Sequence, residues 1–172
     1  MRNNTLIMSA ALSACLLFLS VSCGTLKKSS SYIPPLTEVT VREVMLDPES
    51  KLPVVLLQDL SGRITLPIWI GSNEAIAIAT PLEQVSFRRP MTHDLLYTIL
   101  IETHVSVLKV VVTELRDNTF YANLYLKTGG KTLTIDSRPS DAIAIAVRTD
   151  APIYVATELL LTMGIKRGIE HL

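Results

Sequence analysis

The sequence predicts an α+β fold: one compact domain, residues 36–166, in which an antiparallel β-meander followed by a buried helix is used twice. The first observation is an internal repeat, because residues 75–79 and 142–146 both read Ala-Ile-Ala-Ile-Ala, 67 residues apart. The second is period-two alternation of apolar residues before each of these segments, which is typical of half-buried strands. The same offset relates further residues, pairing Gly62 with Gly129, Thr65 with Thr132, Leu66 with Leu133, Ile68 with Ile135 and Glu74 with Asp141.

Residues 1–22 are predicted to be a signal peptide. Residues 6–21 are uncharged and mostly apolar, follow a single basic residue, and end in small residues before Cys23. The segment Leu19-Ser-Val-Ser-Cys23 resembles a bacterial lipobox, in which the signal is cut before a cysteine that then carries lipid. Cys15 is the other cysteine open to such processing, and an uncleaved membrane anchor is the alternative for the whole segment. The prediction is an exported, membrane-anchored lipoprotein of the cell envelope, facing the periplasm or the cell surface and attached through Cys23.

Charge and cysteine content exclude several classes of site. Without residues 1–22 the chain holds 15 basic and 16 acidic residues, so no global basic field attracts nucleic acid and any nucleic acid must be held locally. With Cys15 removed and Cys23 lipidated, the folded part has no thiol, which excludes disulfides, zinc–thiolate sites and cysteine nucleophiles. Residues 23–35 are polar, Ser-rich and end in a double proline, which is typical of a flexible tether.

The first half of the domain is predicted to contain a three-strand antiparallel meander and a helix. Alternation places the strands at about residues 39–44, 54–57 and 64–70. A helix follows, because alanine is the strongest helix former and Ser72 or Asn73 can cap the first turn beside Glu74. Isoleucines two residues apart point to different sides of a helix, so this one is expected to be buried all round. The capping-box spacing at Thr80-Pro-Leu-Glu83 predicts that the helix breaks and restarts there.

The second half repeats this plan after an intervening helix. That helix is expected at residues 93–102, with Thr92 as its cap. The second copy of the apolar helix begins after Ser137, which can cap it, and places Pro139 in a first turn where a missing N–H costs nothing. The remaining elements are strands at 105–115, 120–127, 132–136 and 152–155, a helix at 157–163 and a tail at 167–172.

Polar chemistry concentrates at the starts of two helices. In the first, residues 136–141 hold two carboxylates, two hydroxyls and a guanidinium. Asp136 and Asp141 together can ligate a hard divalent cation, and Arg138 can bind a phosphate through its planar fork. The alternative is structural, since an acidic first turn and a serine cap stabilise any helix, and Arg138 can simply pair with Asp136.

The second polar helix start holds His93 and Asp94, preceded by Arg88 and Arg89. His93 can act as a general base near a phosphate or as a metal ligand. The alternative is an exposed or hydrogen-bonded histidine without a catalytic role. A Ser140–His93–Asp triad is supported by residue types alone, and the sequence contains no His-Glu-x-x-His motif, phosphate-cradling glycine loop or nucleophile elbow.

Five segments of the chain carry a resemblance to a known family. They are Leu66-Pro-Ile-Trp-Ile-Gly71, Glu74-Ala-Ile-Ala-Ile-Ala79, Arg89-Pro-Met-Thr-His-Asp-Leu95, Ser137-Arg-Pro-Ser-Asp-Ala-Ile-Ala-Ile-Ala-Val-Arg148 and Pro152-Ile-Tyr-Val155. In this order, and over about residues 36–165, the chain resembles the bifunctional nuclease domain family. The resemblance implies a compact α+β domain that forms homo-oligomers, and a metal-assisted hydrolysis of DNA and RNA phosphodiesters.

Carried over by motif, the resemblance also implies the site residues. Catalysis falls to His93, Asp94, Ser140 and Asp141, and substrate binding to Arg89, Arg138 and Ser137. For the divalent metal, Mg²⁺ or Mn²⁺, the expected ligands are Asp141 with Asp94, or Asp141 with Asp136, which is proposed from its residue type and not from the family motif. The hypothesis is therefore a nuclease tethered to the cell envelope, with nucleic acid as its partner. The alternative, which the near-neutral charge favours, is a lipid-anchored binding or assembly module that keeps the fold without catalysis.

Overall fold

The computed structural model describes residues 34–167. The predicted signal peptide, Cys23 and almost all of the tether therefore lie outside the described residues, as do residues 168–172 of the tail. Within residues 34–167, no helix is both long enough and apolar enough to cross a membrane. The elements are β1 (Leu36–Leu46), β2 (Pro53–Asp59), β3 (Ile64–Trp69), α1 (Ser72–Leu82), α2 (Thr92–Glu102), β4 (Ser106–Arg116), β5 (Thr119–Thr128), β6 (Lys131–Ser137), α3 (Pro139–Thr149), β7 (Ile153–Ala156), α4 (Thr157–Met163) and β8 (Ile165–Lys166).

The strands form one eight-stranded sheet that contains the two predicted meanders. Its order is β6-β5-β4-β7-β1-β2-β3-β8. Strands β1, β2 and β3 pair antiparallel in sequence order, as do β4, β5 and β6. The short strand β7 joins the two meanders, because it pairs antiparallel with β1 and parallel with β4. The α+β fold class and the duplicated plan are confirmed.

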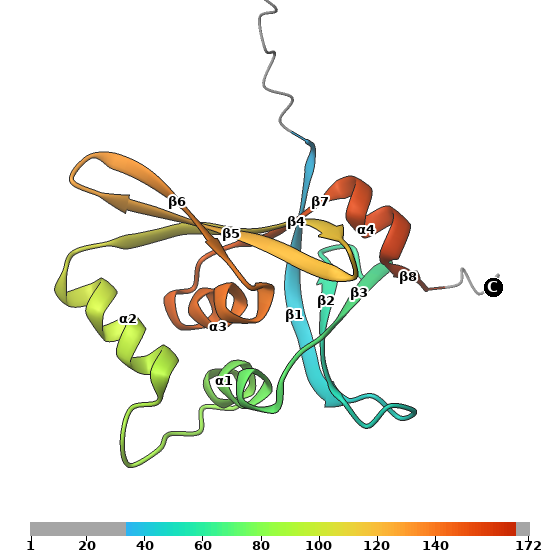
Figure 1. Ribbon diagram of the computed structural model, residues 1–172, viewed down its shortest axis with the longest axis horizontal. Helices are drawn as coiled ribbons and strands as arrows, with labels where there is room; N and C mark the ends of the chain where they lie inside the picture. Colours follow the sequence, from blue (N-terminus) through green and yellow to red (C-terminus); the bar gives the residue numbers. More distant parts are fainter. Residues whose placement is uncertain (1–33, 168–172) are drawn as a thin grey trace, which may run out of the picture. The chain divides into compact units, whose positions relative to one another are not determined.

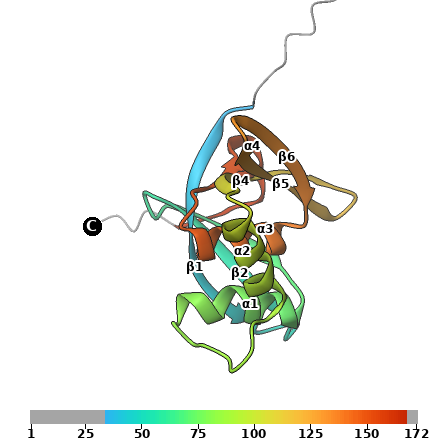
Figure 2. The same cartoon turned by 90° about the vertical axis from the view of Figure 1, so that its left-hand side faces the viewer.

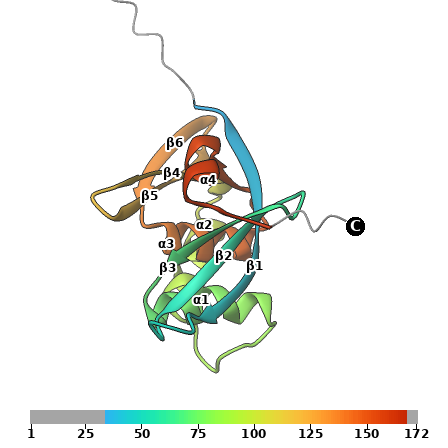
Figure 3. The ribbon, with the colours of Figure 1, turned by 90° about the vertical axis from the view of Figure 1, so that its right-hand side faces the viewer.

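The internal repeat holds in three dimensions. Shifting the bounds of α1 by 67 residues gives those of α3, and the same shift places β3 on β6. Helices α1 and α3 pack against each other, and Figure 1 shows α1 nearly end-on below α3. Helix α2 packs against α3 and lies in front of it in Figure 2. Helix α4 packs on the opposite side of the sheet, nearest the viewer in Figure 3.

The two apolar helices are not equally buried, which corrects one expectation. In α3 the side chains from Pro139 to Ala146 are buried, apart from Asp141, because the sheet, α1 and α2 enclose this helix. In α1 only Ala77 and Ile78 are buried. Ile76 is 45% exposed, whereas its counterpart Ile143 is 0% exposed. The prediction that α1 is buried on every side was wrong, since this helix lies at the margin of the layer.

Helix α1 also passes through Thr80-Pro81 without the predicted break, and ends at Leu82. Pro81 has no N–H to donate to the carbonyl of Ala77, four residues earlier. That carbonyl instead accepts a hydrogen bond of 2.7 Å from Nη1 of Arg148. The hydrogen bond from the Arg148 guanidinium thus takes the place of the backbone hydrogen bond that Pro81 cannot make, and α1 continues for one more residue, to Leu82.

The predicted caps of three helices were wrong. The cap position of α1 is Gly71, where Ser72 or Asn73 was expected. The cap positions of α2 and α3 are Met91 and Arg138, each one residue from the predicted Thr92 and Ser137, and no cap side chain with a hydroxyl takes part. At α2, the carboxylate of Asp94 reaches back and accepts a 2.9 Å bond from the backbone N–H of Met91, which satisfies a free donor of the helix start. Ser137 is instead the last residue of β6, and its buried Oγ has no hydrogen-bond partner in the described part of the chain.

Candidate active site

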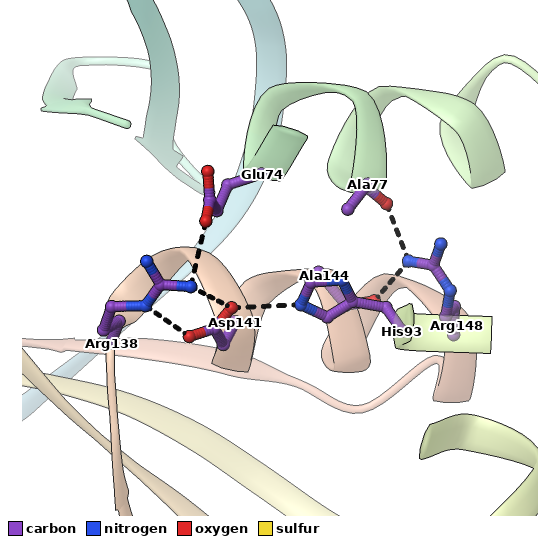
Figure 4. Close-up of polar contacts among 7 residues, drawn as sticks. All are labelled: Glu74, Ala77, His93, Arg138, Asp141, Ala144 and Arg148. Carbon is purple, nitrogen blue, oxygen red and sulfur yellow. Dashed lines mark hydrogen bonds and ion pairs between the residues drawn. The ribbon is translucent and has the colours of Figure 1, made fainter. Parts of the chain in front are cut away.

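A cluster of four side chains joins the starts of α1, α2 and α3. His93 Nε2 lies 3.1 Å from Oδ1 of Asp141. Arg138 makes a two-pronged contact with the same carboxylate, with Nε 2.6 Å from Oδ2 and Nη2 2.9 Å from Oδ1. Nη2 also lies 2.9 Å from Oε1 of Glu74. Figure 4 shows this arrangement of Glu74, His93, Arg138 and Asp141, which is called the polar cluster below.

The fold brings these residues together because helix starts converge. Glu74 and Asp141 are each the third residue of their helix, and His93 is the second residue of α2. Carboxylates in a first turn are stabilised by the positive end of the helix dipole. Residues 93 and 141 are 48 positions apart in the chain, and the packing of α2 on α3 makes them neighbours.

The electrostatics of the polar cluster keep Asp141 ionised. Burial acts to raise its pKa, but hydrogen bonds from Arg138 and His93 and the positive charge of Arg138 outweigh this, so the pKa lies below the ordinary 3.8. The same contact raises the pKa of Arg138, first through hydrogen bonding to Asp141 and then through the charge of Asp141. Asp141 therefore acts as a permanent anion that orients its neighbours, and does not transfer protons near neutral pH.

The polar cluster lines an open hollow of about 730 Å³, together with residues of α1, α2 and the loop before α2. The Arg138 side chain, at the edge of this hollow, is 65% exposed. Its Nη1 makes no hydrogen bond within the described residues. A guanidinium held by two carboxylates, with one nitrogen directed outward, can bind an anion such as a phosphate.

Asp94, predicted beside His93 as a catalytic residue and metal ligand, belongs to a different contact. Its Oδ1 lies 2.8 Å from Nε of Arg148, and its Oδ2 accepts the bond from Met91 N–H. Arg148 is 5% exposed and also donates to the carbonyls of Ala77 and Ala144, at 2.7 and 2.8 Å. Burial acts to raise the pKa of Asp94, yet these partners lower it. Asp94 and Arg148 therefore fasten α1, α2 and α3 together.

The other predicted residues make no hydrogen bond or ion pair with His93 among residues 34–167. Ser140 is buried and lines a second hollow, with Arg138 the only residue of the polar cluster that reaches it. Asp136 lies on β6, where its charge, after Tyr121 and Glu114, raises the pKa of Arg116. The remaining substrate-binding predictions are Ser137, at the end of β6, and Arg89, which is exposed in the loop between α1 and α2. The structure thus brings together His93, Asp141 and Arg138. It leaves five predicted residues outside their contacts: Asp94, Arg89, Asp136, Ser137 and Ser140.

The carboxylates predicted as metal ligands do not form a common site in this arrangement. Asp141 faces Arg138 and Asp94 faces Arg148, whereas Asp136 lies on β6. Among residues 34–167, no three histidine, cysteine, aspartate or glutamate side chains gather so as to hold a metal ion. Hard divalent cations need several oxygen ligands free of competing cations. The divalent metal therefore stays a prediction, for which this donor set gives no support.

Two members of these contacts were not singled out from the sequence. Glu74 could have been found, because it is the counterpart of Asp141 at the offset of 67 residues. Arg148 carries no such signal, since it follows an apolar run and its counterpart is Pro81. Only the packing of α1 on α3 shows that this arginine contacts two equivalent carbonyls.

Comparison with known proteins places the chain in a family. Residues 55–168 match the model of the bifunctional nuclease domain. The chain belongs to the bifunctional nuclease domain family. It is 38% identical over 128 residues to the uncharacterized protein MT1877 of Mycobacterium tuberculosis, covering 74% of this chain and 76% of that protein.

Two plant relatives carry the family's name. The chain is 31% identical over 116 residues to bifunctional nuclease 2 of Arabidopsis thaliana, and 28% identical over 116 residues to bifunctional nuclease 1 of Oryza sativa subsp. japonica. Each match covers 66% of this chain but only 35% of the plant protein. The plant proteins therefore contain long regions that have no counterpart in the match.

Proposed function

We propose that this bifunctional nuclease domain hydrolyses phosphodiester bonds of DNA and RNA at the polar cluster. The observation that carries the proposal is the 3.1 Å contact between His93 and Asp141, which joins two separate family motifs at one open hollow. The names of the plant relatives support nucleic acid as the substrate class.

His93 is proposed as the group that moves the proton. A hydrogen bond donated from Nε2 to Asp141 favours the tautomer that leaves Nδ1 as an acceptor. In this tautomer Nδ1 takes a proton from a water molecule whose oxygen attacks the phosphorus. The ester bond breaks, and the leaving oxygen keeps the bonding electron pair and takes a proton from solvent to become a hydroxyl. The Asp141 anion stabilises the imidazolium that forms, as in other aspartate–histidine pairs.

Arg138 is proposed to bind the phosphate. Charge accumulates on the non-bridging oxygens in phosphoryl transfer, and a guanidinium positioned in advance stabilises it. Glu74 and Asp141 hold this guanidinium through Nη2 and Nε, which leaves Nη1 for the substrate. The steps assigned here use only side chains of this chain, while dependence on Mg²⁺ or Mn²⁺ is tested separately below.

Three further proposals concern the setting of the domain. A lipid anchor at Cys23, location at the cell envelope and assembly into homo-oligomers all rest on the sequence and the family resemblance. Metabolic labelling with a radioactive fatty acid tests the first, with Cys23→Ala and Cys15→Ala compared, because only loss of the lipidated cysteine abolishes labelling. Light scattering of the purified chain tests the third, and a monomer mass would contradict it.

The test of catalysis uses the full chain purified in detergent, with supercoiled plasmid and a single-stranded RNA as substrates. His93→Asn is expected to lower the cleavage rate by about 10²- to 10⁴-fold, the usual contribution of a general base. His104→Asn is the matched control, because His104 is an exposed histidine in a left-handed backbone conformation that asparagine accepts. Equal cleavage by His93→Asn and wild type would overturn the assignment.

The same assay separates the remaining alternatives. Parallel reactions with Mg²⁺, Mn²⁺ or a chelator show whether a metal ion is required. The alternative function, a non-catalytic binding module, is favoured by the formal net charge of +0 and by the two carboxylates already paired with Arg138. Binding of the substrates without cleavage under all three conditions would establish that alternative.

A further inference from the structure

A second hollow adjoins the polar cluster and has no role in the proposed reaction. It measures about 410 Å³ and lies between the end of β3, the start of β5 and the first turn of α3. Figure 1 shows the turn between β4 and β5 reaching toward β3. Arg138 lines both hollows. A ligand group in the second hollow is therefore next to the place proposed for the phosphate.

Trp69 provides the main aromatic surface of the second hollow. It is the one tryptophan of the chain, and it is 51% exposed. Its indole Nε1 lies 3.3 Å from Oδ2 of Asp47, which fixes the orientation of the ring. Phe120 lines the same hollow. An oriented, half-exposed indole with a second aromatic nearby provides a surface on which a flat ligand can stack.

Polar groups at the rim complement the aromatic surface. Asn118, Thr119 and Ser140 line the hollow and carry the polar side chains in question. Asp117 and Asn118 both have positive φ, 49° and 60°, so they form a tight turn beside the hollow, which Asn118 lines. An asparagine amide offers both a donor and an acceptor, which is the pattern needed to bind the edge of a nucleobase.

We propose that the second hollow binds one nucleobase of a single-stranded nucleic acid, stacked on Trp69, while the adjoining phosphate lies at Arg138. This inference rests on the proposed function for its phosphate, but the aromatic surface and the polar rim specify a base independently. A base must leave its stack to enter such a hollow, so single strands are favoured over duplexes. Stacking also supplies affinity that a chain of zero formal net charge cannot obtain from a basic surface.

The first experiment measures the intrinsic fluorescence of the full chain, whose tryptophan signal comes from Trp69 alone. Titration with adenosine 5′-monophosphate is expected to quench this signal to saturation, whereas ribose 5-phosphate, which carries the same phosphate without a base, leaves it unchanged. Equal quenching by the two ligands, or by neither, overturns the proposed base site.

The second experiment measures the affinity for a labelled single-stranded oligonucleotide by fluorescence anisotropy. Trp69→Leu is expected to weaken binding by about 5- to 150-fold, the usual contribution of one stacked base. Phe87→Leu is the matched control, because Phe87 is 52% exposed and lies outside both hollows. Equal affinities of Trp69→Leu and Phe87→Leu contradict the proposal.

The outcomes separate this proposal from the proposed nuclease activity. Base-dependent quenching in a chain that cleaves nothing supports the base site and refutes the nuclease. Cleavage that depends on His93, without base-dependent quenching, supports the nuclease and overturns the base site.

Discussion

The two copies of the repeated unit have the same backbone plan but different environments. In the first copy, β2 and β3 lead through Gly71 into α1, and in the second, β5 and β6 lead through Arg138 into α3. α3 lies between the sheet and two helices, whereas α1 has one side toward solvent. The duplication therefore explains the shared backbone arrangement of the two copies. The residues that differ at equivalent positions indicate where the candidate active site lies.

Two arginines each contact a pair of equivalent groups, one group from each copy of the repeated unit. Glu74 and Asp141, related by the offset of 67 residues, both contact Arg138. The carbonyls of Ala77 and Ala144, related in the same way, both accept from Nη1 of Arg148. Arg138 is exposed and Arg148 is buried. The first arginine is thus placed to bind a ligand, and the second to fix the packing of the copies.

Replacing the buried arginine tests whether Arg148 stabilises the packing of the two copies while Arg138 does not. Arg148→Met is expected to lower the free energy of unfolding by about 3 kcal/mol, because it leaves Oδ1 of Asp94 and the Ala77 carbonyl without their partner. Arg138→Met, the exposed control, is expected to cost less than about 1 kcal/mol. Urea denaturation measures both, and equal losses would show that the two arginines do not differ in this way.

A double-mutant cycle with Pro81 tests whether Arg148 replaces the hydrogen bond that proline removes. Pro81→Ala restores an N–H that can donate to the Ala77 carbonyl, so it is expected to reduce the cost of Arg148→Met by about 1 kcal/mol. Additive effects of the two substitutions would contradict the proposed replacement of the proline's missing hydrogen bond.

Equivalent isoleucines test the difference in burial. Ile143→Ala is expected to destabilise the domain by about 2–5 kcal/mol, because Ile143 is fully buried. Ile76→Ala, at the equivalent position of α1, is expected to cost less than about 1 kcal/mol in the isolated chain, since much of this side chain is already in water. A large loss at Ile76 in urea denaturation would indicate that another surface covers it, and a repeat at low protein concentration would identify a second copy.

Substitutions at the two equivalent carboxylates, Asp141 and Glu74, test whether they contribute differently to cleavage. Asp141→Asn is expected to reduce the cleavage rate about 10²-fold or more, because it removes the anion that orients both His93 and Arg138. Glu74→Gln should lower the rate by no more than about 10-fold, since Glu74 contacts Arg138 alone in the polar cluster. Rates on the same RNA substrate provide the comparison, and equal losses would mean that orientation of His93 contributes nothing.

The pH dependence of stability gives the smallest expected effect. The pKa of Asp141 is lower in the folded chain than its ordinary 3.8, so its stabilising contribution is fully present above 3.8 and is lost as pH falls through the folded pKa. Asp141→Asn should therefore show a flatter decline of stability in acid than the wild type, measured as urea midpoints from neutral pH downward. Asp94 titrates in both proteins and does not affect the difference. Parallel declines would refute the stabilising ion pair.

Much of the fold could be predicted because its signals are local. Alternation marks the strands of both meanders, and the identical Ala-Ile-Ala-Ile-Ala segments mark α1 and α3. The helix starts were predicted within one residue, but the cap residues were not, because a carboxylate at the third position of α2 served in place of the Thr92 hydroxyl. The continuation of α1 through Pro81 was missed for another reason: the donor that replaces its N–H comes from Arg148, on a different helix.

The sequence by itself determined the strand and helix pattern apart from the two-residue strand β8, which was not predicted. It also determined the duplication and the two polar helix starts that contain His93 and Asp141. The tertiary structure decided which polar residues meet. It selected Asp141 over Asp94 as the partner of His93, added Glu74, placed Ser140 in a separate hollow with Trp69, and used Arg148 for packing. The reason is physical: periodicity and repeats depend on residues near in sequence, whereas contacts between helix starts depend on how α1, α2 and α3 pack against one another.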